Sequence, residues 1–154
     1  MLLFQLESWD SCLPEILELF KEHEIELSSA LPVKVNLNMG HYEQLYNGGR
    51  LLLLTARDKG VMVGYCIMQL APHHRAKDVL VAKEEAMWLR RDHRKGYNGV
   101  RLVKKALLMA KFFGAELAYF GSSEAHPIGT LLKYCGFKKA SEIFTINLLE
   151  KENG

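Results

Sequence analysis

The first strongly patterned stretch of the chain has the period of an α-helix. From residue 11 to residue 24, apolar side chains recur at three- and four-residue intervals, and charged side chains occupy the positions between them. The apolar set is Leu13, Ile16, Leu17 and Phe20. Ser11 or Asp10 is suited to cap this helix, and Pro14 fits its first turn, where no N–H is needed.

Weaker signals surround this helix. Residues 1–6 are predicted to be a short strand or a lead-in without regular structure. A turn is expected around Ser28-Ser29 and Pro32, because serine and proline favour turns. A second, shorter helix is expected over residues 39–46, and the Asn-Gly-Gly sequence at 47–49 ends it.

The middle of the chain changes to the pattern of a β-sheet. Residues 51–56 and 61–70 are two apolar runs that include β-branched side chains, and Arg-Asp-Lys-Gly separates them at 57–60. A short polar connection that ends in glycine is typical of a hairpin. Residues 79–89 form a third strand in this prediction.

The last part of the chain alternates between helix and strand. An amphipathic helix is predicted over residues 99–113, a strand over 116–120, a short helix over 127–134 and a final strand over 143–149. This order of elements indicates an α/β fold with one mixed sheet, and we expect residues 1–154 to form one domain.

Composition and charge exclude several classes of protein. The 154 residues are 49% hydrophobic and 25% charged, which excludes a disordered chain, a collagen-like repeat and a disulfide scaffold. The net charge of +2 argues against a nucleic-acid partner, and no apolar run has the length that a membrane span requires. The N-terminal sequence has no secretion signal, so we expect a cytoplasmic protein. The three cysteines, which contain no C-x-x-C pair, are expected to be small buried or half-buried thiols: Cys12, Cys66 and Cys135.

The charge is nevertheless uneven, because a basic turn lies between the third predicted strand and the long helix. Seven of the 20 basic residues are here: Arg90, Arg91, Arg94, Lys95, Arg101, Lys104 and Lys105. The first turn of a helix attracts anions, and Gly96 and Gly99 allow the backbone to approach a phosphate closely. The turn is therefore interpreted as a phosphate or diphosphate cradle, with a plain solvated basic turn as the alternative. Its glycine spacing matches neither a P-loop nor a dinucleotide fingerprint.

This turn resembles the cofactor motif of the GNAT (general N-acetyltransferase) superfamily. Its spacing, Arg94-x-Gly96-x-x-Gly99, is a variant similar to that of many phage-encoded and related bacterial members. Residues 60–65 (Gly-Val-Met-Val-Gly-Tyr) and 131–137 (Leu-Leu-Lys-Tyr-Cys-Gly-Phe) resemble two further landmarks of the family, in the right order. The resemblance implies a mixed, mostly antiparallel central sheet of about six strands flanked by about four helices.

The resemblance also implies a reaction. The chain would transfer acetyl from acetyl-CoA to a primary amine of a small molecule or protein, by direct attack in a ternary complex and without a metal. A non-catalytic module that binds acetyl-CoA or a protein is the alternative. In such a fold the main chain of Trp88, Leu89 and Arg90 would contact the cofactor's pantetheine arm, although the Trp88 side chain is expected in the core. The pyrophosphate would meet Arg94, Lys95, Gly96, Asn98, Gly99 and Val100.

Two adjacent glutamates are candidates for the general base that such a reaction needs. Strand alternation directs Glu84 and Glu85 to opposite faces, and we favour Glu85 because alternation puts it with Met87 and Leu89. Either glutamate could instead be an ordinary solvent-facing strand residue.

The proton donor for the leaving thiolate is less clear from the sequence. Family members often carry a tyrosine at the position of Leu132, whereas Tyr134 lies roughly 200° further around the helix. Tyr97, His126 and water are the remaining donors.

Two further features of the sequence concern the binding of the acceptor amine. Glutamates crowd the first helix, where they would either favour a cationic amine or form a solvated helix face: Glu15, Glu18, Glu22, Glu24 and Glu26. His73 and His74 follow a strand and would line an acceptor pocket or an exposed loop, and they have no partner at metal-ligand spacing. Whether two copies form a homodimer is left open.

Overall fold

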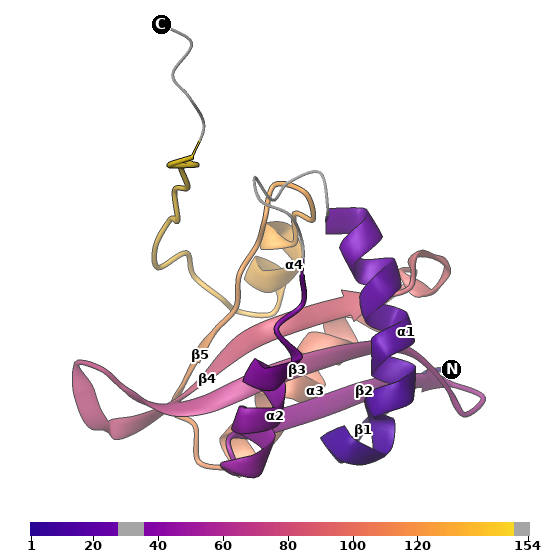
Figure 1. Ribbon diagram of the computed structural model, residues 1–154, viewed down its shortest axis with the longest axis horizontal. Helices are drawn as coiled ribbons and strands as arrows, with labels where there is room; N and C mark the ends of the chain where they lie inside the picture. Colours follow the sequence, from indigo (N-terminus) through magenta and orange to yellow (C-terminus); the bar gives the residue numbers. More distant parts are fainter. Residues whose placement is uncertain (28–35, 150–154) are drawn as a thin grey trace, which may run out of the picture.

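Five strands form one twisted sheet in chain order in the computed structural model, which describes residues 1–27 and 36–149 (Figure 1). The first four strands are antiparallel: β1 (Leu3–Leu6), β2 (Leu51–Asp58), β3 (Val61–His73) and β4 (Ala76–Leu89). The short β5 (Leu117–Tyr119) joins β4 in parallel. The turn expected around Ser28-Ser29 and Pro32 lies outside the described residues.

Helices cover both faces of this sheet. The helices are α1 (Trp9–Leu27), α2 (Met39–Asn47), α3 (Asn98–Phe112) and α4 (Gly129–Tyr134), and a single 3-10 turn (Arg91–His93) follows β4. One core cluster lies between the sheet and α1 with α2, and another lies between the sheet and α3 with α4. The sheet is therefore the middle layer of three.

Strand alternation divides the core residues between these two layers. On β3, Tyr65 and Ile67 pack against α1, whereas Cys66 and Met68 pack against α3. All four side chains are fully buried, as expected for a central strand covered on both faces.

Most predicted elements are confirmed, with shifted ends. The hairpin between β2 and β3 turns at Lys59 and Gly60, whose φ angles of 49° and 84° lie in the left-handed region. Residues 1–6 contain the strand β1 and not only a lead-in, and α1 extends beyond the predicted 11–24 at both ends. Cys12 and Cys66 are buried free thiols and Cys135 is half-buried, in agreement with the sequence. None of the helices over 1–27 and 36–149 is long and apolar enough to cross a membrane.

The predicted final strand is wrong. Residues 143–149 have no strand conformation, so the described part of the chain holds five strands and not about six. The apolar pattern is present, but a strand also needs a neighbour that completes its hydrogen bonds. This segment leaves the body of the molecule, and its apolar side chains are exposed.

Candidate functional site

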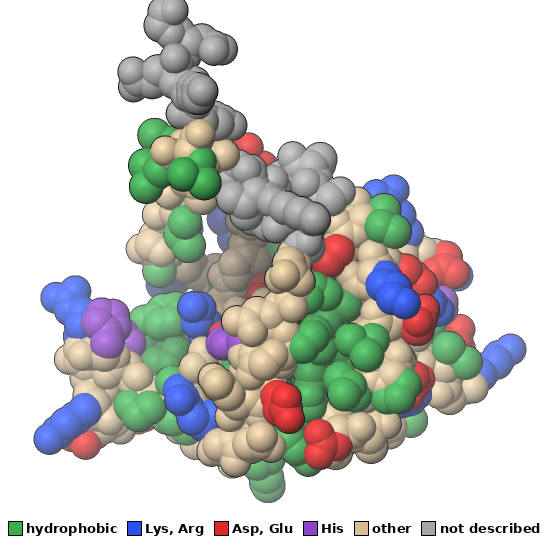
Figure 2. All heavy atoms as spheres, in the orientation of Figure 1, with side chains coloured by type: hydrophobic (Ala, Val, Ile, Leu, Met, Phe, Trp, Pro, Cys, Tyr) green, Lys and Arg blue, Asp and Glu red, His purple; other side chains and the backbone are tan. Residues whose placement is uncertain are grey.

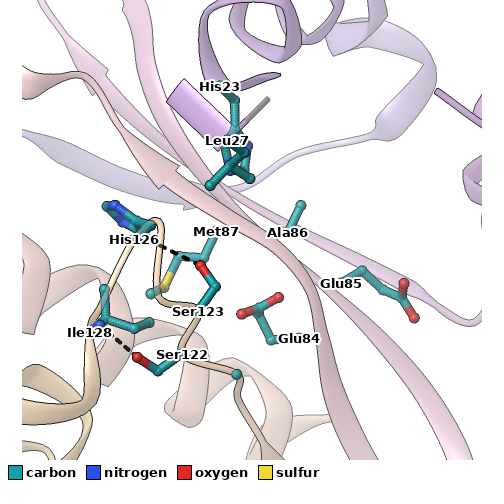
Figure 3. A pocket seen from close by; sticks show the side chains of 11 residues that line it. His23, Leu27, Glu84, Glu85, Ala86, Met87, Ser122, Ser123, His126 and Ile128 are labelled. Atoms are coloured by element: carbon teal, nitrogen blue, oxygen red, sulfur yellow. Dashed lines mark hydrogen bonds between the residues drawn. The ribbon is translucent and has the colours of Figure 1, made fainter. Parts of the chain in front are cut away.

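A cleft opens where β4 and β5 part. The two strands pair only through Val81–Lys83 on β4 and Leu117–Tyr119 on β5, and beyond these residues they separate. The resulting cleft has a volume of about 260 Å³ (Figure 3). Its walls are Glu84, Glu85, Ala86 and Met87 of β4, Gly121, Ser122, Ser123, His126 and Ile128 of the loop after β5, and His23 and Leu27 of α1.

A β-bulge in β4 decides which side chains face this cleft. Ile67 of β3 pairs with Ala86, but the next residue, Met68, pairs with Glu84, so Glu85 is an extra residue. The extra residue interrupts the alternation of faces. Glu84, paired with Met68, lies on the face of α3 together with Met87.

The expectation that Glu85 shares a face with Met87 is therefore wrong. Figure 3 shows Glu84 directed toward Ser122 and Ser123, whereas Glu85 points away from them. The sequence carried no signal for the bulge, because neither glycine nor proline stands at this position.

Glu84 is a half-buried carboxyl group at the inner end of the cleft. Burial raises its pKa to about 7, although the N–H of Gly121 donates a hydrogen bond to the carboxylate and acts in the opposite direction. The nearby charge of Glu85 raises the pKa further. A carboxyl group with this pKa exchanges protons near neutral pH, which is the property that a general base needs.

Glu85 has a different environment. Its carboxylate lies 3.1 Å from Nε2 of His41 on α2, so it belongs to the side of the sheet that α2 covers. This pair links α2 to the bulge of β4. The structure thus separates the two adjacent glutamates into one that faces the cleft and one that is held by a helix.

The basic turn and the start of α3 form the second part of the site. Gly96 has a φ of 58°, and the space around its missing Cβ is open. No side chain caps α3, and in its first turn the N–H of Asn98 donates to the carbonyl of Lys95 at 3.3 Å. Asn98 braces the loop instead, since its side-chain amide donates to the carbonyl of His93 at 2.9 Å. A Cβ on Gly99 would stand 3.4 Å from the side chain of Leu131, an ordinary van der Waals distance, so the packing of α3 on α4 does not require a glycine here.

Arg94 is not directed into this loop as the sequence suggested. Its guanidinium donates two hydrogen bonds to Glu26 of α1, at 2.6 and 2.7 Å, and a third to the carbonyl of Leu89 at 2.5 Å. The reason is the position of α1, whose end lies over the loop and presents a carboxylate there. Lys95 and Gly96 remain exposed.

Glu26 organises several of the residues around it. The indole N–H of Trp88 donates to its carboxylate at 2.6 Å, and Arg91 and His126 lie 3.6 and 3.7 Å from it. The hydrogen bonds of Arg94 are the main reason that the pKa of Glu26 falls to about 2. Sequence reasoning missed this role, because a partner 68 residues away leaves no local pattern.

Three residues at the end of β4 were predicted to contact the pantetheine arm through their main chain: Trp88, Leu89 and Arg90. The side chain of Trp88 is buried and stacks on His23, as expected for a core residue. The N–H of Arg90 donates to the carbonyl of Val63 on β3, so this group points away from the cleft. Leu89 lies between them, and its carbonyl is the acceptor for Arg94.

The residues considered for protonating the leaving thiolate differ in burial and in their distance from the cleft. Leu132 is buried in the core under α3, and Tyr134 is exposed beside Lys104, 5.9 Å from its ring. Tyr134 therefore cannot take over a role at the position of Leu132. Tyr97 is exposed, whereas His126 lines the cleft, where burial and then Arg94 lower its pKa.

The acidic side of α1 is largely neutralised within the protein. Glu15 pairs with Arg57 at 2.9 Å, Glu22 pairs with Arg90 at 2.9 Å, and Glu26 pairs with Arg94. Figure 2 accordingly shows acidic and basic side chains interspersed over α1. The face is thus neither simply solvated nor a free anionic surface for a cationic acceptor.

The adjacent histidines lie at the tip of the long β3–β4 hairpin. The rings of His73 and His74 stack at 4.9 Å, and Nε2 of His73 lies 3.2 Å from the hydroxyl of Tyr119. They do not line the cleft. Within 1–27 and 36–149, no group of three or more histidine, cysteine or carboxylate side chains is arranged to hold a metal.

Comparison with solved structures identifies the same fold in acetyltransferases. A ribosomal-protein-alanine N-acetyltransferase from Brucella melitensis biovar Abortus 2308 superposes with a TM-score of 0.75 at 15% identity, over 96% of this chain and 97% of that one. A protein from Clostridium acetobutylicum described as a predicted acetyltransferase, solved with acetyl-CoA, gives 0.72 at 12% identity over 99% of each chain. An aminoglycoside acetyltransferase from an uncultured soil metagenomic sample, solved with sisomicin, gives 0.70 at 12% identity over 97% of each chain.

By sequence alone, the chain matches no family model and no curated protein. The structural likeness, at identities of 12–15%, establishes the fold that the resemblance to the GNAT superfamily implied. The chain therefore has the mixed α/β fold of these acetyltransferases.

Proposed function

We propose that this protein is an acetyl-CoA-dependent N-acetyltransferase of the GNAT type, in which Glu84 is the general base. The observation that carries the proposal is the position of Glu84, a carboxyl group of pKa about 7 at the inner end of the cleft between β4 and β5. The fold supports it, since the proteins that share it include acetyltransferases, one of them solved with acetyl-CoA.

The residues present fit the cosubstrate. The open space at Gly96 and the start of α3, which no side chain caps, would accept the pyrophosphate, with Gly99 and Val100 supplying main-chain N–H groups, Asn98 bracing the loop and Lys95 supplying a positive charge. Arg94 would support this site indirectly, because its ion pair with Glu26 holds the loop in place. The pantetheine arm would run along the open edge of β4 at Leu89, with Trp88 and Arg90 on either side. When bound, acetyl-CoA supplies an activated acetyl group as a thioester.

Glu84 would prepare the acceptor. An amine attacks only as the neutral species, so a proton must leave its nitrogen before or during attack. Ionised Glu84 takes this proton, directly or through one water. The nitrogen lone pair then forms the new C–N bond, and the C–S bond breaks.

The departing sulfur also needs a proton. Leu132 offers no hydroxyl, and the lowered pKa of His126 keeps its ring neutral near pH 7, so it is a weak acid. Water is therefore the donor in this proposal. The missing hydroxyl is also the observation that favours the second candidate function, a binding module that holds acetyl-CoA without turnover.

Two measurements test the proposal. Calorimetric titration with acetyl-CoA is expected to detect one site per chain, and free thiol is expected to appear when primary amines are added. The amine panel includes polyamines, aminoglycosides and lysine peptides. Binding without thiol release from any amine would favour the second function, and absence of binding would exclude both.

A further inference from the structure

His23 is a buried histidine that lines the cleft and has no part in the proposed transfer step. It lies on α1 and is 8% exposed, and Figure 3 shows it and Glu84 as two separate polar groups of the lining. One face of its ring stacks on the indole of Trp88, with ring centroids 5.7 Å apart. The ring therefore has a fixed position between the core and the cleft.

Tyr65 of β3 determines which ring nitrogen of His23 carries the hydrogen. The Tyr65 hydroxyl lies 2.6 Å from Nδ1 of His23, which is its partner among the described residues, and Tyr65 is fully buried. A buried O–H needs an acceptor, so the hydroxyl donates to Nδ1, and Nδ1 carries no hydrogen. Burial lowers the pKa of His23 to about 4, which keeps the ring neutral at pH 7. The single ring hydrogen is therefore on Nε2.

Nε2 is the part of this ring that reaches the cleft. Among residues 1–27 and 36–149, no group forms a hydrogen bond with it. No side-chain nitrogen or oxygen in these ranges is both buried and without a partner, so Nε2 has accessible surface. Nδ1 points into the core and His23 lines the cleft, so the N–H of Nε2 is directed to the cleft. The cleft thus contains a fixed, neutral donor that a ligand oxygen would satisfy.

Two serines add neutral donors to the same cleft. The N–H of Ile128 donates to Oγ of Ser122 at 2.8 Å, and the N–H of His126 donates to Oγ of Ser123 at 3.1 Å. Each of these oxygens is an acceptor, so its own hydrogen is free to donate. Among the described residues that line the cleft there is no lysine or arginine. The lining suits an amine that carries a neutral oxygen better than one that carries a carboxylate.

We propose that the Nε2–H of His23 donates a hydrogen bond to a neutral oxygen of the acceptor, which is therefore an amine that also carries a hydroxyl or carbonyl group. The inference rests on the proposed function, because Glu84 takes the proton from the amine of the same molecule. An acceptor without the oxygen leaves this buried N–H unpaired, and such a loss discriminates strongly between similar substrates.

Nitrogen NMR of the full chain with labelled histidine tests the inference without turnover. At pH 7 we expect His23 to carry its hydrogen on Nε2 alone, and we expect signals of both neutral forms in Tyr65→Phe. With CoA present, ethanolamine and glycinamide should shift the Nε2 signal of His23 at lower concentrations than propylamine and isobutylamine, which have the same sizes without the oxygen. A hydrogen on Nδ1 in the native protein, or no difference within either pair of amines, would overturn the proposal.

Kinetics test the same preference during thiol release from acetyl-CoA. The double variant His23→Phe with Tyr65→Phe removes both hydrogen-bonding partners and keeps two aromatic rings in the core, so it is expected to fold. Tyr65→Phe alone is the matched control, because it retains His23. The ratio of kcat/KM for ethanolamine to that for propylamine should fall at least about tenfold in the double variant and less than about threefold in the control. Because ratios are compared between proteins, the different basicities of the amines cancel.

The two experiments separate this inference from the proposed function. A purely structural role of His23 would lower the rates with both amines equally, so an unchanged ratio in the double variant would overturn the inference. Thiol release with an unselective Nε2 signal would also overturn it, and the proposed function would stand. A selective Nε2 signal without thiol release from any amine would support the binding role of His23 and count against acetyl transfer.

Discussion

The guanidinium of Arg94 forms a two-pronged ion pair with the carboxylate of Glu26, with N–O distances of 2.6 and 2.7 Å. Through this pair, the loop that precedes α3 is attached to the end of α1, and the paired residues lie 68 positions apart in the sequence. The proposed cofactor loop therefore takes its position from a helix that sequence analysis assigned to the acceptor side.

Removing this pair is expected to destabilise the protein. Glu26→Gln leaves Arg94 half-buried without its counter-charge, and we expect the free energy of unfolding to fall by about 2 kcal/mol. Glu18→Gln breaks the exposed pair with Lys21 and is the control, with an expected loss below about 0.5 kcal/mol. Urea denaturation at pH 7 measures both, and similar losses would show that Glu26 is an ordinary surface residue.

Exchanging the carboxylate in the cleft is expected to abolish most activity. Glu84→Gln keeps the size of the side chain but cannot take up a proton, so kcat should fall by about 10²- to 10⁴-fold with little change in acetyl-CoA affinity. Glu85→Gln, at the position bound to His41, should retain activity within about tenfold. Steady-state kinetics decide between the two, and a greater loss in Glu85→Gln would reverse our assignment.

The pH dependence of kcat/KM tests the role of Glu84 independently. Because Glu84 has a pKa of about 7 and acts when ionised, kcat/KM should rise with pH through about 7 and then level off. The experiment follows thiol release between pH 5.5 and pH 9. Persistence of the same rising limb in the residual activity of Glu84→Gln would assign it to another group.

The pH dependence of the free energy of unfolding should contain opposite contributions from His23 and Glu84. Burial lowers the pKa of His23 from 6.5 to about 4, so the unfolded chain takes up this proton first as the pH falls, and stability decreases by up to roughly 3 kcal/mol. Burial raises the pKa of Glu84, so the folded chain takes up that proton first between pH 7 and 4.5, and stability increases. The two trends oppose each other in the native protein.

Single substitutions separate the contribution of Glu84 from that of His23. Between pH 7 and pH 4.5, the free energy of unfolding of Glu84→Gln should fall as the pH falls, whereas that of His23→Gln should rise. Denaturant titrations at several pH values measure both slopes. Parallel slopes in the two variants would contradict the assignment.

Substitution of Gly96 should weaken acetyl-CoA binding by more than its effect on stability explains. Gly96→Val imposes a positive φ on a branched side chain and fills the open space at the start of α3, so acetyl-CoA affinity should fall at least about tenfold. Gly49→Val imposes a similar strain, at a φ of 69°, in the turn before β2, at the end of the sheet opposite to the end where the loop follows β4. It should lower the melting temperature and leave acetyl-CoA affinity unchanged in calorimetry. Equal affinities in both variants would remove the loop from the binding site.

The sequence predicted the parts of this fold that depend on local pattern. The amphipathic helices, the hairpin at Lys59 and Gly60 and the basic turn before α3 are each encoded by adjacent residues. The cleft between β4 and β5 has no local signal in the sequence, because it depends on how far the two strands pair.

What could not be predicted depends on distant partners. The ion pairs of α1 join residues 42 and 68 positions apart, and no periodicity reports such a contact. The choice between Glu84 and Glu85 needed the position of the bulge, which pairing with β3 determines. The predicted final strand was wrong for the same reason, because an apolar pattern does not say whether a neighbouring strand is there to pair with it.

The bulge at Glu85 also explains why the cleft exists. A strand with one extra residue bends away from its partners, and this bend follows directly after Lys83, the last residue that β4 shares with β5. The extra residue thus changes the path of β4 as well as the faces on which the preceding side chains lie. Backbone length, and not side-chain chemistry, opens the space in which the proposed reaction would occur.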